Sequence, residues 1–582
     1  MGLLYSAEWT SMTGDQYTVQ IIDSTLQYDP EIAIDLGPDG FVIDYEGDPK
    51  NLTRGIIPSS CSISMLIPDA SFETFISDLA NSAENRFFVD IYHGSGNLPF
   101  WRGNIVPDIC SFPDADFPYI FNLKAIDGLA KLKDVTLSSS YFSSQIDDLV
   151  SILSNLETSI LWDSNDIFLL TAVNWYNSVM GTPSSSLDPL TKTLSSDQCY
   201  SFFDSKKQLQ HTNCYHALEM LTTLWNARLF IANGRFYFIQ INELKNPSTY
   251  IRYYDISGNQ ISSGSLNLEV TGIQRTGNFS YLRPVKIVSI EQNYWASYVS
   301  NRLPALTNYS NSIDVGMFSA GNGESLKIIG DILVDVSDSG NNQVENQVHF
   351  QLKINVGDYY LKNPGGIFEW TTNSNAAVDI YPYDVEENYN YYKTISISID
   401  TPKIPKFGNS EFSLNFLQFE NPDGNKITPP ATVSWSFSYS NFNLTQTVMP
   451  DTVKIKHSET GTTGGTEYEK KLPEISMGDG PSSDANTKLK VYNNSTSSWE
   501  DSRDKWSEGG IGTPTWINQL LVKKNLALQS TARLRFNGTI ANVDYRPYQT
   551  FTINSHKFTL LSASFYANRK EWRGYFHEIK ET

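Results

Sequence analysis

The sequence predicts a mainly β, multidomain protein, with tube-like β-barrel or sandwich domains, a few short helices and an inserted β-sandwich. Its 582 residues are enough for several domains of ordinary size. Apolar residues make up 40% of the chain and aromatic residues 13%, so large cores can be buried and a disordered protein is excluded. Short runs rich in Tyr, Phe, Ile, Val and Thr alternate with Ser, Asn, Gly and Asp, which is typical of strands joined by turns.

Residues 1–140 are expected to form an N-terminal β-barrel domain with one helix. In 16–22 (QYTVQII) and 61–67 (CSISMLI) every second residue is apolar, which indicates strands lying on a core. The apolar spacing changes to that of a helix over 72–79. Residues 86–106 then predict a β-hairpin with a loop of moderate length.

Residues 141–289 are expected to form a second domain from helices and a β-hairpin. Apolar residues follow helical spacing in 146–156 and again in 214–225. The next stretch, ARLFIANGRFYFIQI, holds two apolar runs around Asn233-Gly234. Both central residues of a two-residue type I′ turn need positive φ, which Asn-Gly supplies, so Arg228–Ala232 should pair with Arg235–Ile241.

Residues 290–445 predict a jelly-roll-like β-sandwich, because strands of strict alternation such as 348–356 recur there. Aromatic residues near these strands could bind a carbohydrate or a partner protein, or could be ordinary rim and core residues: Tyr359, Tyr360, Trp370, Tyr381 and Tyr383. Residues 446–582 predict a loop-rich region, a helix near 516–521, and C-terminal strands. Those strands are too few for a core of their own and are expected to return to an earlier domain.

The charge of the chain is strongly and unevenly negative. The net charge is −21, and no basic stripe of the kind that wraps nucleic acid is present. Residues 1–50 hold ten acids and one base, whereas 519–582 hold ten bases and four acids. These segments are either two solvated faces or complementary surfaces that meet within or between subunits. The first interpretation is favoured, because exposed ion pairs contribute little stability.

The N-terminus lacks the features of a signal peptide, and no apolar run is long enough to predict a membrane span. The four cysteines are too few for a disulfide framework and are expected to be reduced and largely buried.

The motifs of nucleotide loops, zinc proteases and serine hydrolases do not occur in the sequence. One group of two thiols and two imidazoles could in principle form a tetrahedral zinc site: Cys199, His211, Cys214 and His216. Their spacing lacks the tight C-x₂₋₄-C pair of structural zinc, and Cys214 lies on the apolar face of the helix expected there, so core packing is favoured. We therefore predict no catalytic, cofactor-binding or metal-binding residue, no cofactor and no enzymatic activity.

Acidic pairs could serve a glycosidase only if two carboxylates flanked one bond in a cleft. The candidates are Asp114 with Asp116 and Asp147 with Asp148, and the second pair is better explained as acids in the first turn of a helix. The NPDGN segment at 421–425 predicts a turn, since a calcium loop would need further acids and a terminal Glu.

Four stretches, taken in order, resemble tail hub or baseplate-type proteins of phages and prophages of Bacteroidetes. The stretches are VIDYEGDPKNLTRGIIPSSCSISMLI (42–67); RFFVDIYHGSGNLPFWRGNIVPDI (86–109) with YIFNLKAIDGLAKLKDV (119–135); CYHALEMLTTLWNARLFIANGRFYFIQI (214–241); and LKINVGDYYL (352–361) with the closing EWRGYFHEI (571–579). The order of these stretches carries the resemblance, which extends from one end of the chain to the other.

The resemblance implies a structural virion component at the distal end of the tail. Such proteins are typically homotrimers with two barrel-like domains per chain, and they join the tail tube or distal tail protein to a central spike or to fibres. They surround the DNA channel without specific binding, and a channel lined with carboxylates would repel the passing DNA. The alternative functions are a receptor- or glycan-binding tail adhesin, based on the aromatic residues of 290–445, and a polysaccharide depolymerase.

Overall fold

The structure is a computed structural model that describes the chain from Met1 to Lys580 with internal gaps. The residues not described are 97, 139–142, 204–208, 297–298, 302–311, 315–317, 321–324, 339–347, 357, 381–389, 403, 406–407, 421–425, 428–432, 448–450, 462–467, 480–488, 542–543 and 581–582. The predicted turn at 421–425 and the aromatic residues Tyr381 and Tyr383 therefore lie outside the described residues.

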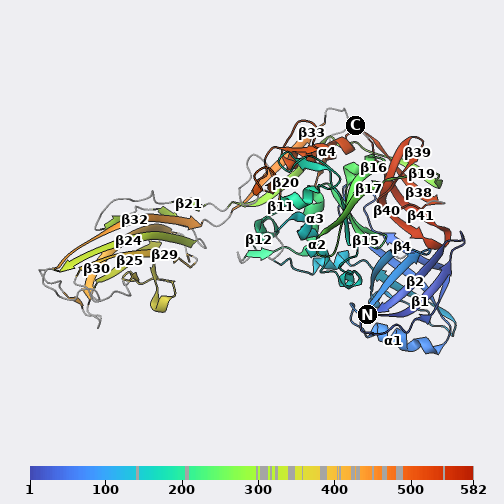
Figure 1. Ribbon diagram of the computed structural model, residues 1–582, viewed down its shortest axis with the longest axis horizontal. Helices are drawn as coiled ribbons and strands as arrows, with labels where there is room; N and C mark the ends of the chain where they lie inside the picture. The colour runs from blue at the N-terminus through green and yellow to red at the C-terminus, as the bar shows by residue number, and fades with distance from the viewer. Residues whose placement is uncertain are drawn as a thin grey trace. The chain divides into compact units, whose positions relative to one another are not determined.

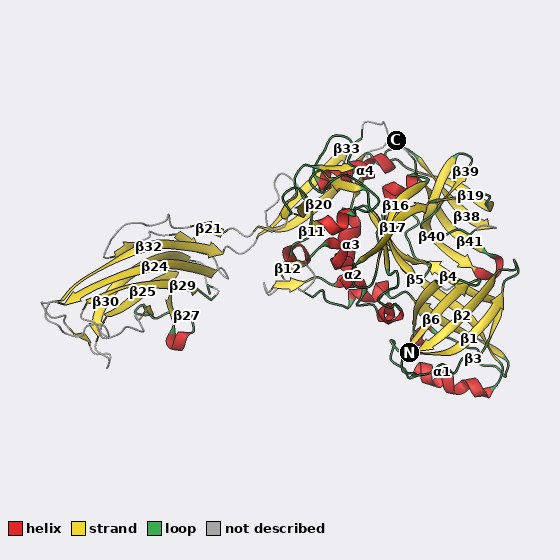
Figure 2. Cartoon of the chain, in the orientation of Figure 1, coloured by secondary structure: helices red, strands yellow, loops and turns green. Residues whose placement is uncertain are grey.

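Strands dominate the structure, as Figure 2 shows, and the helices are few and short. The predicted mainly β, multidomain fold is confirmed. The chain forms two compact units: the first combines Met1–Tyr294 with Val453–Thr582, and the second is Trp295–Thr452. The strand leading into the second unit, β20 (Ile287–Ala296), pairs with the strand leading out of it, β33 (Asp451–Thr460). The second unit is thus an insertion whose two connections to the first unit are neighbouring strands.

A sheet of 14 strands forms the framework of the first unit. In spatial order its strands are β19 (Gln274–Leu282), β38 (Arg533–Ala541), β41 (Glu571–Glu578), β40 (His556–Tyr566), β4 (Asp35–Tyr45), β5 (Ser59–Ile67), β8 (Tyr119–Ile126), β7 (Pro99–Ile105), β6 (Phe87–His93), β2 (Gln16–Asp23), β1 (Gly2–Thr10) and β3 (Ile32–Ala33). In addition, β39 (Thr550–Ile553) pairs with β40, and β18 (Glu269–Val270) pairs with β39. In Figure 1 the red C-terminal strands continue the sheet from the blue strand β4. Both ends of the chain therefore belong to one hydrogen-bonded sheet.

The N-terminal strands curl around a shared core but do not close into a barrel. Trp9 on β1 and Tyr17 on β2 pack against Phe41 on β4, with ring centroids 6.2 Å and 5.1 Å from that of Phe41. Among the described residues, however, β4 pairs with β5 and β40 and not with β1. The expectation of a closed, tube-like barrel is corrected here, because the C-terminal strand β40 occupies the edge of β4 that closure would need.

A five-stranded sheet lies next along the chain and contains the predicted hairpin. Its strands in order are β14 (Ala227–Ala232), β15 (Arg235–Gln240), β9 (Leu169–Ala172), β16 (Ser248–Tyr254) and β17 (Gln260–Asn267). Ala232 pairs with Arg235 across the turn, where Asn233 has φ 47° and Gly234 has φ 62°. The predicted Asn-Gly hairpin is confirmed, and it formed as expected because the turn chemistry and the two apolar runs favour the same register.

Four α-helices occur in the described residues, and helical spacing predicted each of them. They are α1 (Glu73–Ala80), α2 (Gln145–Leu153), α3 (Cys214–Leu224) and α4 (Ile517–Gln529). Asn213 caps α3, since its Oδ1 accepts a hydrogen bond of 2.7 Å from the backbone N–H of His216. Short 3-10 helices are η1 (Ala70–Phe72), η2 (Pro107–Ile109), η3 (Leu129–Lys133), η4 (Glu157–Leu161), η5 (Pro189–Lys192), η6 (Asp197–Tyr200), η7 (Ile241–Lys245), η9 (Pro364–Gly366) and η10 (Ala567–Arg569).

The remaining strands of the first unit form small sheets around the helices. They are β10 (Trp175–Asn177) with β37 (Trp506–Glu508); β11 (Thr193–Leu194), β35 (Lys490–Asn493) and β36 (Ser498–Asp501); β12 (Ser201–Phe203) with β13 (Leu209–His211); and β34 (Glu469–Lys471), which pairs with β20. The loop-rich region therefore contributes strands to the small sheets of the first unit.

The second unit consists of two sheets. One contains β21 (Val299–Asn301), β32 (Val433–Thr447), β24 (Ser325–Asp338) and β29 (Asn390–Asp400). The other contains β22 (Ser312–Asp314), β30 (Gly408–Glu420), β25 (Val348–Val356), β26 (Tyr359–Lys362) and β27 (Glu369–Thr371), with β23 (Phe318–Ala320) and β31 (Lys426–Ile427) on β30 and β28 (Val378–Ile380) on β25. Ile328 from the first sheet and Ile354 from the second are both fully buried.

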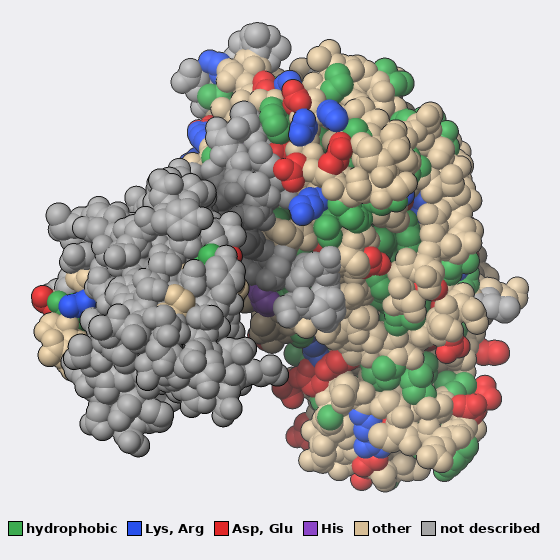
Figure 3. All heavy atoms as spheres, turned by 60° about the vertical axis from the view of Figure 1, so that its left-hand side comes forward, with side chains coloured by type: hydrophobic (Ala, Val, Ile, Leu, Met, Phe, Trp, Pro, Cys, Tyr) green, Lys and Arg blue, Asp and Glu red, His purple; other side chains and the backbone are tan. Residues whose placement is uncertain are grey.

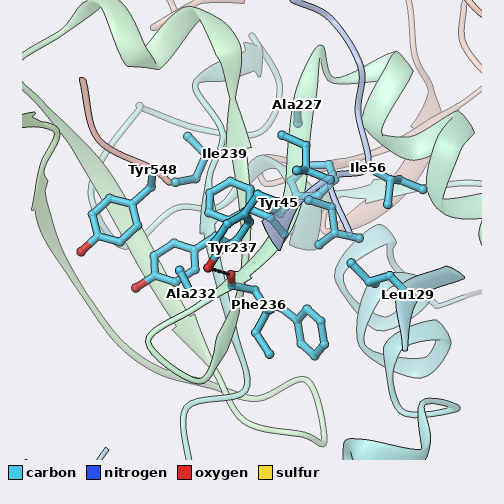
Figure 4. Packing of buried hydrophobic residues seen from close by; sticks show 14 of the residues in the cluster. Tyr45, Ile56, Leu129, Ala227, Ala232, Phe236, Tyr237, Ile239 and Tyr548 are labelled. Carbon is cyan, nitrogen blue, oxygen red and sulfur yellow. Dashed lines mark hydrogen bonds between the residues drawn. The ribbon is translucent and has the colours of Figure 1, made fainter. Parts of the chain in front are cut away.

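One core connects the two large sheets of the first unit (Figure 4). The Tyr45 hydroxyl at the end of β4 donates a hydrogen bond of 3.0 Å to the carbonyl oxygen of Ile231 on β14. Tyr237 on β15 stacks on Tyr548, with ring centroids 4.8 Å apart. The N-terminal strands, the hairpin and the C-terminal segment therefore stabilise each other, and we expect them to unfold together.

Removing the second unit is expected to leave the first unit folded. If residues 297–450 are replaced by a short Gly-Ser linker, the ends to be joined already lie on the paired strands β20 and β33, so closing the shortened loop costs little entropy. Near-ultraviolet circular dichroism and thermal unfolding of the shortened chain should retain the transition of the first unit. A deletion of 295–460, which also removes β33, is the control and should lower that transition temperature. Aggregation of both variants would contradict the prediction.

Candidate functional site

The four Cys and His residues considered for zinc occupy different environments. His216 is exposed on α3, where its Nδ1 lies 3.2 Å from the Glu219 carboxylate. Cys214 is fully buried on the same helix, and burial raises its pKa to about 11, so it stays a thiol at neutral pH. Cys199 is buried at the end of η6, and His211 is half-buried on β13. Among the described residues these four side chains form no close group of three potential metal ligands.

The two acidic pairs considered for glycoside hydrolysis lie in different environments. Asp114 and Asp116 are exposed between η2 and β8. Asp147 accepts hydrogen bonds of 2.7 Å from the hydroxyls of Ser143 and Ser144 at the start of α2. Asp148 is buried and accepts 2.8 Å from the Tyr200 hydroxyl, and burial raises its pKa well above the usual range. The interpretation of Asp147 and Asp148 as acids in the first turn of a helix is confirmed.

A polar cluster joins the acidic segment 1–50 to the basic segment 519–582, a contact that one interpretation of their charges allowed. Asp15, from the turn between β1 and β2, lies 3.2 Å from His93 Nε2 at the end of β6. The Lys570 ammonium lies 2.8 Å from the carboxylates of both Asp15 and Asp544. Nothing local could have predicted this cluster, since its members come from three distant parts of the sequence.

The chemistry of this cluster favours a cross-link over a metal site. The potential ligand atoms of Asp15, His93 and Asp544 lie within 4.8 Å of one another, which is the geometry a metal ion would need. Lys570, however, already places a positive charge between the two carboxylates. Burial opposes ionisation of Asp15, but the hydrogen bonds from Lys570 and Thr13 outweigh it and hold its pKa below the usual value. We conclude that the cluster ties the first hairpin to the C-terminal segment.

Asp127, in the stretch 119–135, is completely buried at the junction between β8 and η3. Its Oδ2 accepts hydrogen bonds from the backbone N–H and the hydroxyl of Ser59, at 2.5 Å and 2.9 Å, and its Oδ1 accepts 3.0 Å from the N–H of Leu129. Gly128 follows with φ 86°, which glycine adopts without strain. Burial is the dominant influence and raises the pKa of Asp127 to about 7.

Asp127 is expected to make the first unit less stable as pH rises from about 4 to about 7. The folded state holds the proton up to a pKa of about 7, whereas the unfolded state releases it near 3.8. Stability therefore falls across that window, by about 4 kcal/mol in total. Chemical unfolding at several pH values should show this slope, and Asp127→Asn should remove it. The exposed Asp134 supplies the control variant, Asp134→Asn. Equal slopes for the wild type and Asp127→Asn would disprove the assignment.

Acidic and basic side chains are distributed differently over the first unit. Figure 3 shows them interspersed in its upper part, where ion pairs such as Lys454–Glu474 (2.9 Å) and Lys456–Glu469 (2.7 Å) occur. In its lower part, where the N-terminal strands lie in Figure 1, acidic side chains predominate. Six of the ten acids of residues 1–50 are exposed: Glu8, Asp29, Glu31, Asp35, Asp39 and Glu46. The N-terminal strands thus carry an acidic surface.

A helix long and apolar enough to cross a membrane is absent from the described part of the chain.

Comparison with known proteins gives structural matches only. A tail protein from Neisseria meningitidis MC58 aligns over 97% of this chain and 96% of its own, with 7% sequence identity and a TM-score of 0.34. A 43 kDa tail protein of prophage MuSo2 from Shewanella oneidensis aligns over 93% of each chain, with 6% identity and a TM-score of 0.26. With TM-scores below 0.5, neither alignment establishes a shared fold. No protein-family model and no curated protein matches the sequence.

Proposed function

We propose that this chain is a structural subunit of a bacteriophage tail and has no enzymatic role. Within the tail it acts as a hub or baseplate-type protein at the distal end. It assembles as a homotrimer, contacts the tail tube or distal tail protein on one side and the spike or fibre proteins on the other, and surrounds the channel through which DNA passes.

The positions of the stretches that resemble tail hub proteins carry this proposal. Stretch 42–67 forms β4 and β5, and stretch 86–109 with 119–135 forms β6, β7 and β8 of the same sheet. Segment 571–579 contains β41, which β40 joins to β4. Stretch 214–241 forms α3 and the hairpin, and Leu229 in it exchanges hydrogen bonds with Gly55 and Ile57 of the first stretch. Segments far apart in the sequence thus build one continuous framework, as a scaffold protein requires.

The acidic charge of the N-terminal strands supports a position beside the channel, where DNA must pass without binding to the protein. The exposed carboxylates of residues 1–50 would repel the phosphate backbone if these strands faced the channel, and the repulsion would let DNA slide past. The large apolar core of the first unit is buried within the chain, so contacts between subunits would be made by its outer surface. Obligate subunits usually bury more than about 2,000 Å² between them.

The oligomeric mass tests the proposal. Mass photometry of the purified full chain should give three times its 65.5 kDa mass, and negative-stain images should show rings with a central opening. A monomer at micromolar concentration that also fails to bind a tail tube assembled from the same phage would contradict the proposal.

A receptor- or glycan-binding tail adhesin is the second candidate, and the second unit supports it. Tyr359 and Tyr360 on β26 and Trp370 on β27 are half-buried on neighbouring strands, so parts of their rings remain available for stacking on a sugar. Glycan-array binding by the full chain that is lost in Tyr359→Ala and kept in the exposed control Tyr281→Ala would favour this function.

A further inference from the structure

A cavity of about 560 Å³ in the first unit has six basic residues in its lining. It lies where the start of β38, the strand β34, the segment after β4 and the end of β19 meet. Its cationic residues are Lys50, Arg283, Lys470, Lys471, Arg533 and Arg535. Two carboxylates, Asp48 and Glu469, also line it, so the cavity holds an excess of positive charge in a chain whose net charge is −21.

None of the six cations forms an ion pair with a described residue, in contrast to the lysines on the outer surface of the same unit. Lys470 Nζ donates to the side-chain carbonyl oxygens of Asn51 and Gln529, at 2.8 Å and 3.0 Å. Both acceptors are neutral, so they orient the ammonium without balancing its charge. They use two of its three N–H groups, and one N–H remains available for a ligand.

Arg533 is the most buried of the six, with 2% of its surface exposed. Its Nη2 donates 3.1 Å to the carbonyl oxygen of Ala527, while its Nε and Nη1 have no hydrogen-bond partner. Such buried donors are costly unless they are satisfied. Arg535 also donates its hydrogen bonds to neutral oxygens, the Ser280 hydroxyl at 3.2 Å and the carbonyl oxygen of Pro49 at 3.3 Å.

The titration behaviour of the site agrees with an excess of positive charge, which the carboxylates of Asp48 and Glu578 offset only in part. Burial lowers the pKa of Lys470 to about 8 and that of Arg533 to about 10. Burial also lowers the pKa of the neighbouring His577 to about 3, so its ring is neutral at physiological pH. An anion in the cavity would raise the pKa values of all three groups.

We propose that this cavity binds a small phosphate-bearing anion. A phosphate group accepts hydrogen bonds from several directions at once, which matches a cavity lined by several cations, among them an ammonium with one N–H left to donate. The volume suits a small phosphorylated molecule, since ligand pockets commonly measure about 300 to 1,000 Å³. The proposal stands independently of the tail function, because it rests on the lining of the cavity alone.

Isothermal titration calorimetry of the full chain with pyrophosphate, at ionic strength held constant with sodium chloride, tests the site. Saturable binding of one pyrophosphate per chain is expected. Lys470→Gln should weaken that binding about tenfold or more, because one charged donor is lost. Arg283→Gln at the exposed rim should weaken it less. Lys490→Gln removes the same charge from an exposed position outside the cavity and is the control, with unchanged affinity.

Other outcomes would overturn the proposal. Equal affinities for Lys470→Gln and Lys490→Gln would show that binding depends on net charge alone. Citrate bound as tightly as pyrophosphate would remove the preference for phosphate. A short DNA duplex whose binding is weakened by Lys470→Gln, with no pyrophosphate binding, would make the cavity a contact for a DNA backbone instead.

Discussion

Replacing Trp225 by alanine is expected to lower the free energy of unfolding of the first unit by about 4 kcal/mol. Trp225 ends α3 and is fully buried. Its ring packs between those of Trp175 and Trp506, with centroids 6.4 Å and 5.6 Å away. These rings come from β10 and β37, so truncation would leave a cavity where three distant segments meet. Denaturant unfolding measures the change in the free energy of unfolding. Far-ultraviolet circular dichroism is used to follow it, so that the signal does not depend on tryptophan fluorescence.

Two further variants distinguish the cavity from the lost hydrogen bond. Trp225 Nε1 donates 2.7 Å to Gln145 Oε1, so Trp225→Phe keeps most of the packing but leaves this buried acceptor unpaired, at a cost of about 2 kcal/mol. Trp499 on β36 is 37% exposed, and Trp499→Ala should cost less than about 1 kcal/mol. If Trp225→Ala were no more destabilising than Trp499→Ala, Trp225 would not hold the core as described.

Gly47→Ala is expected to destabilise the first unit by about 3 kcal/mol or more. A Cβ atom at Gly47 would lie 1.5 Å from the carbonyl oxygen of Leu561 and 2.7 Å from its carbonyl carbon. Leu561 belongs to β40, and Gly47 follows β4, so the backbones of these two strands would have to separate where the N-terminal and C-terminal parts of the sheet join. Denaturant unfolding of the purified variant measures the loss.

Gly96→Ala is the matched control for this substitution. A Cβ atom at Gly96 would meet only the carbonyl oxygen of His93, at an ordinary 3.5 Å. The control should therefore change stability by no more than about 0.5 kcal/mol. Identical unfolding midpoints for Gly47→Ala and Gly96→Ala would show that the two strands can separate without cost.

The hairpin after α3 shows how far local sequence signals reach. Asn233-Gly234 predicts the turn, the two apolar runs predict the strands, and Cys214, Leu218 and Leu221 predict the helix before them. Each signal acts within a few residues, and each agrees with the others, so the sequence was sufficient to locate these elements.

The candidate sites were less predictable than the elements. The spacing of Cys199, His211, Cys214 and His216 argued against zinc, and the structure places a buried thiol and an exposed imidazole among them. By contrast, no local motif marks the Asp15 cluster or the cavity around Arg533. Their charged groups lie on segments hundreds of residues apart. The sequence around a basic residue in a strand does not show whether carboxylates or only neutral oxygens will surround it in the folded protein.

The sequence by itself determined the elements and the class of the fold, because period-two alternation, helical spacing and turn residues act over short distances. Only the tertiary structure decided that β40 pairs with β4, that the expected barrel stays open as a result, and that the second unit enters and leaves through neighbouring strands. The physical reason is that strand edges carry the same backbone donors and acceptors in every strand, so partner choice depends on which cores can be buried together. The same burial set the pKa of Asp127 and left Arg533 with free N–H groups, since desolvation depends on the packed neighbours and not on the order of residues.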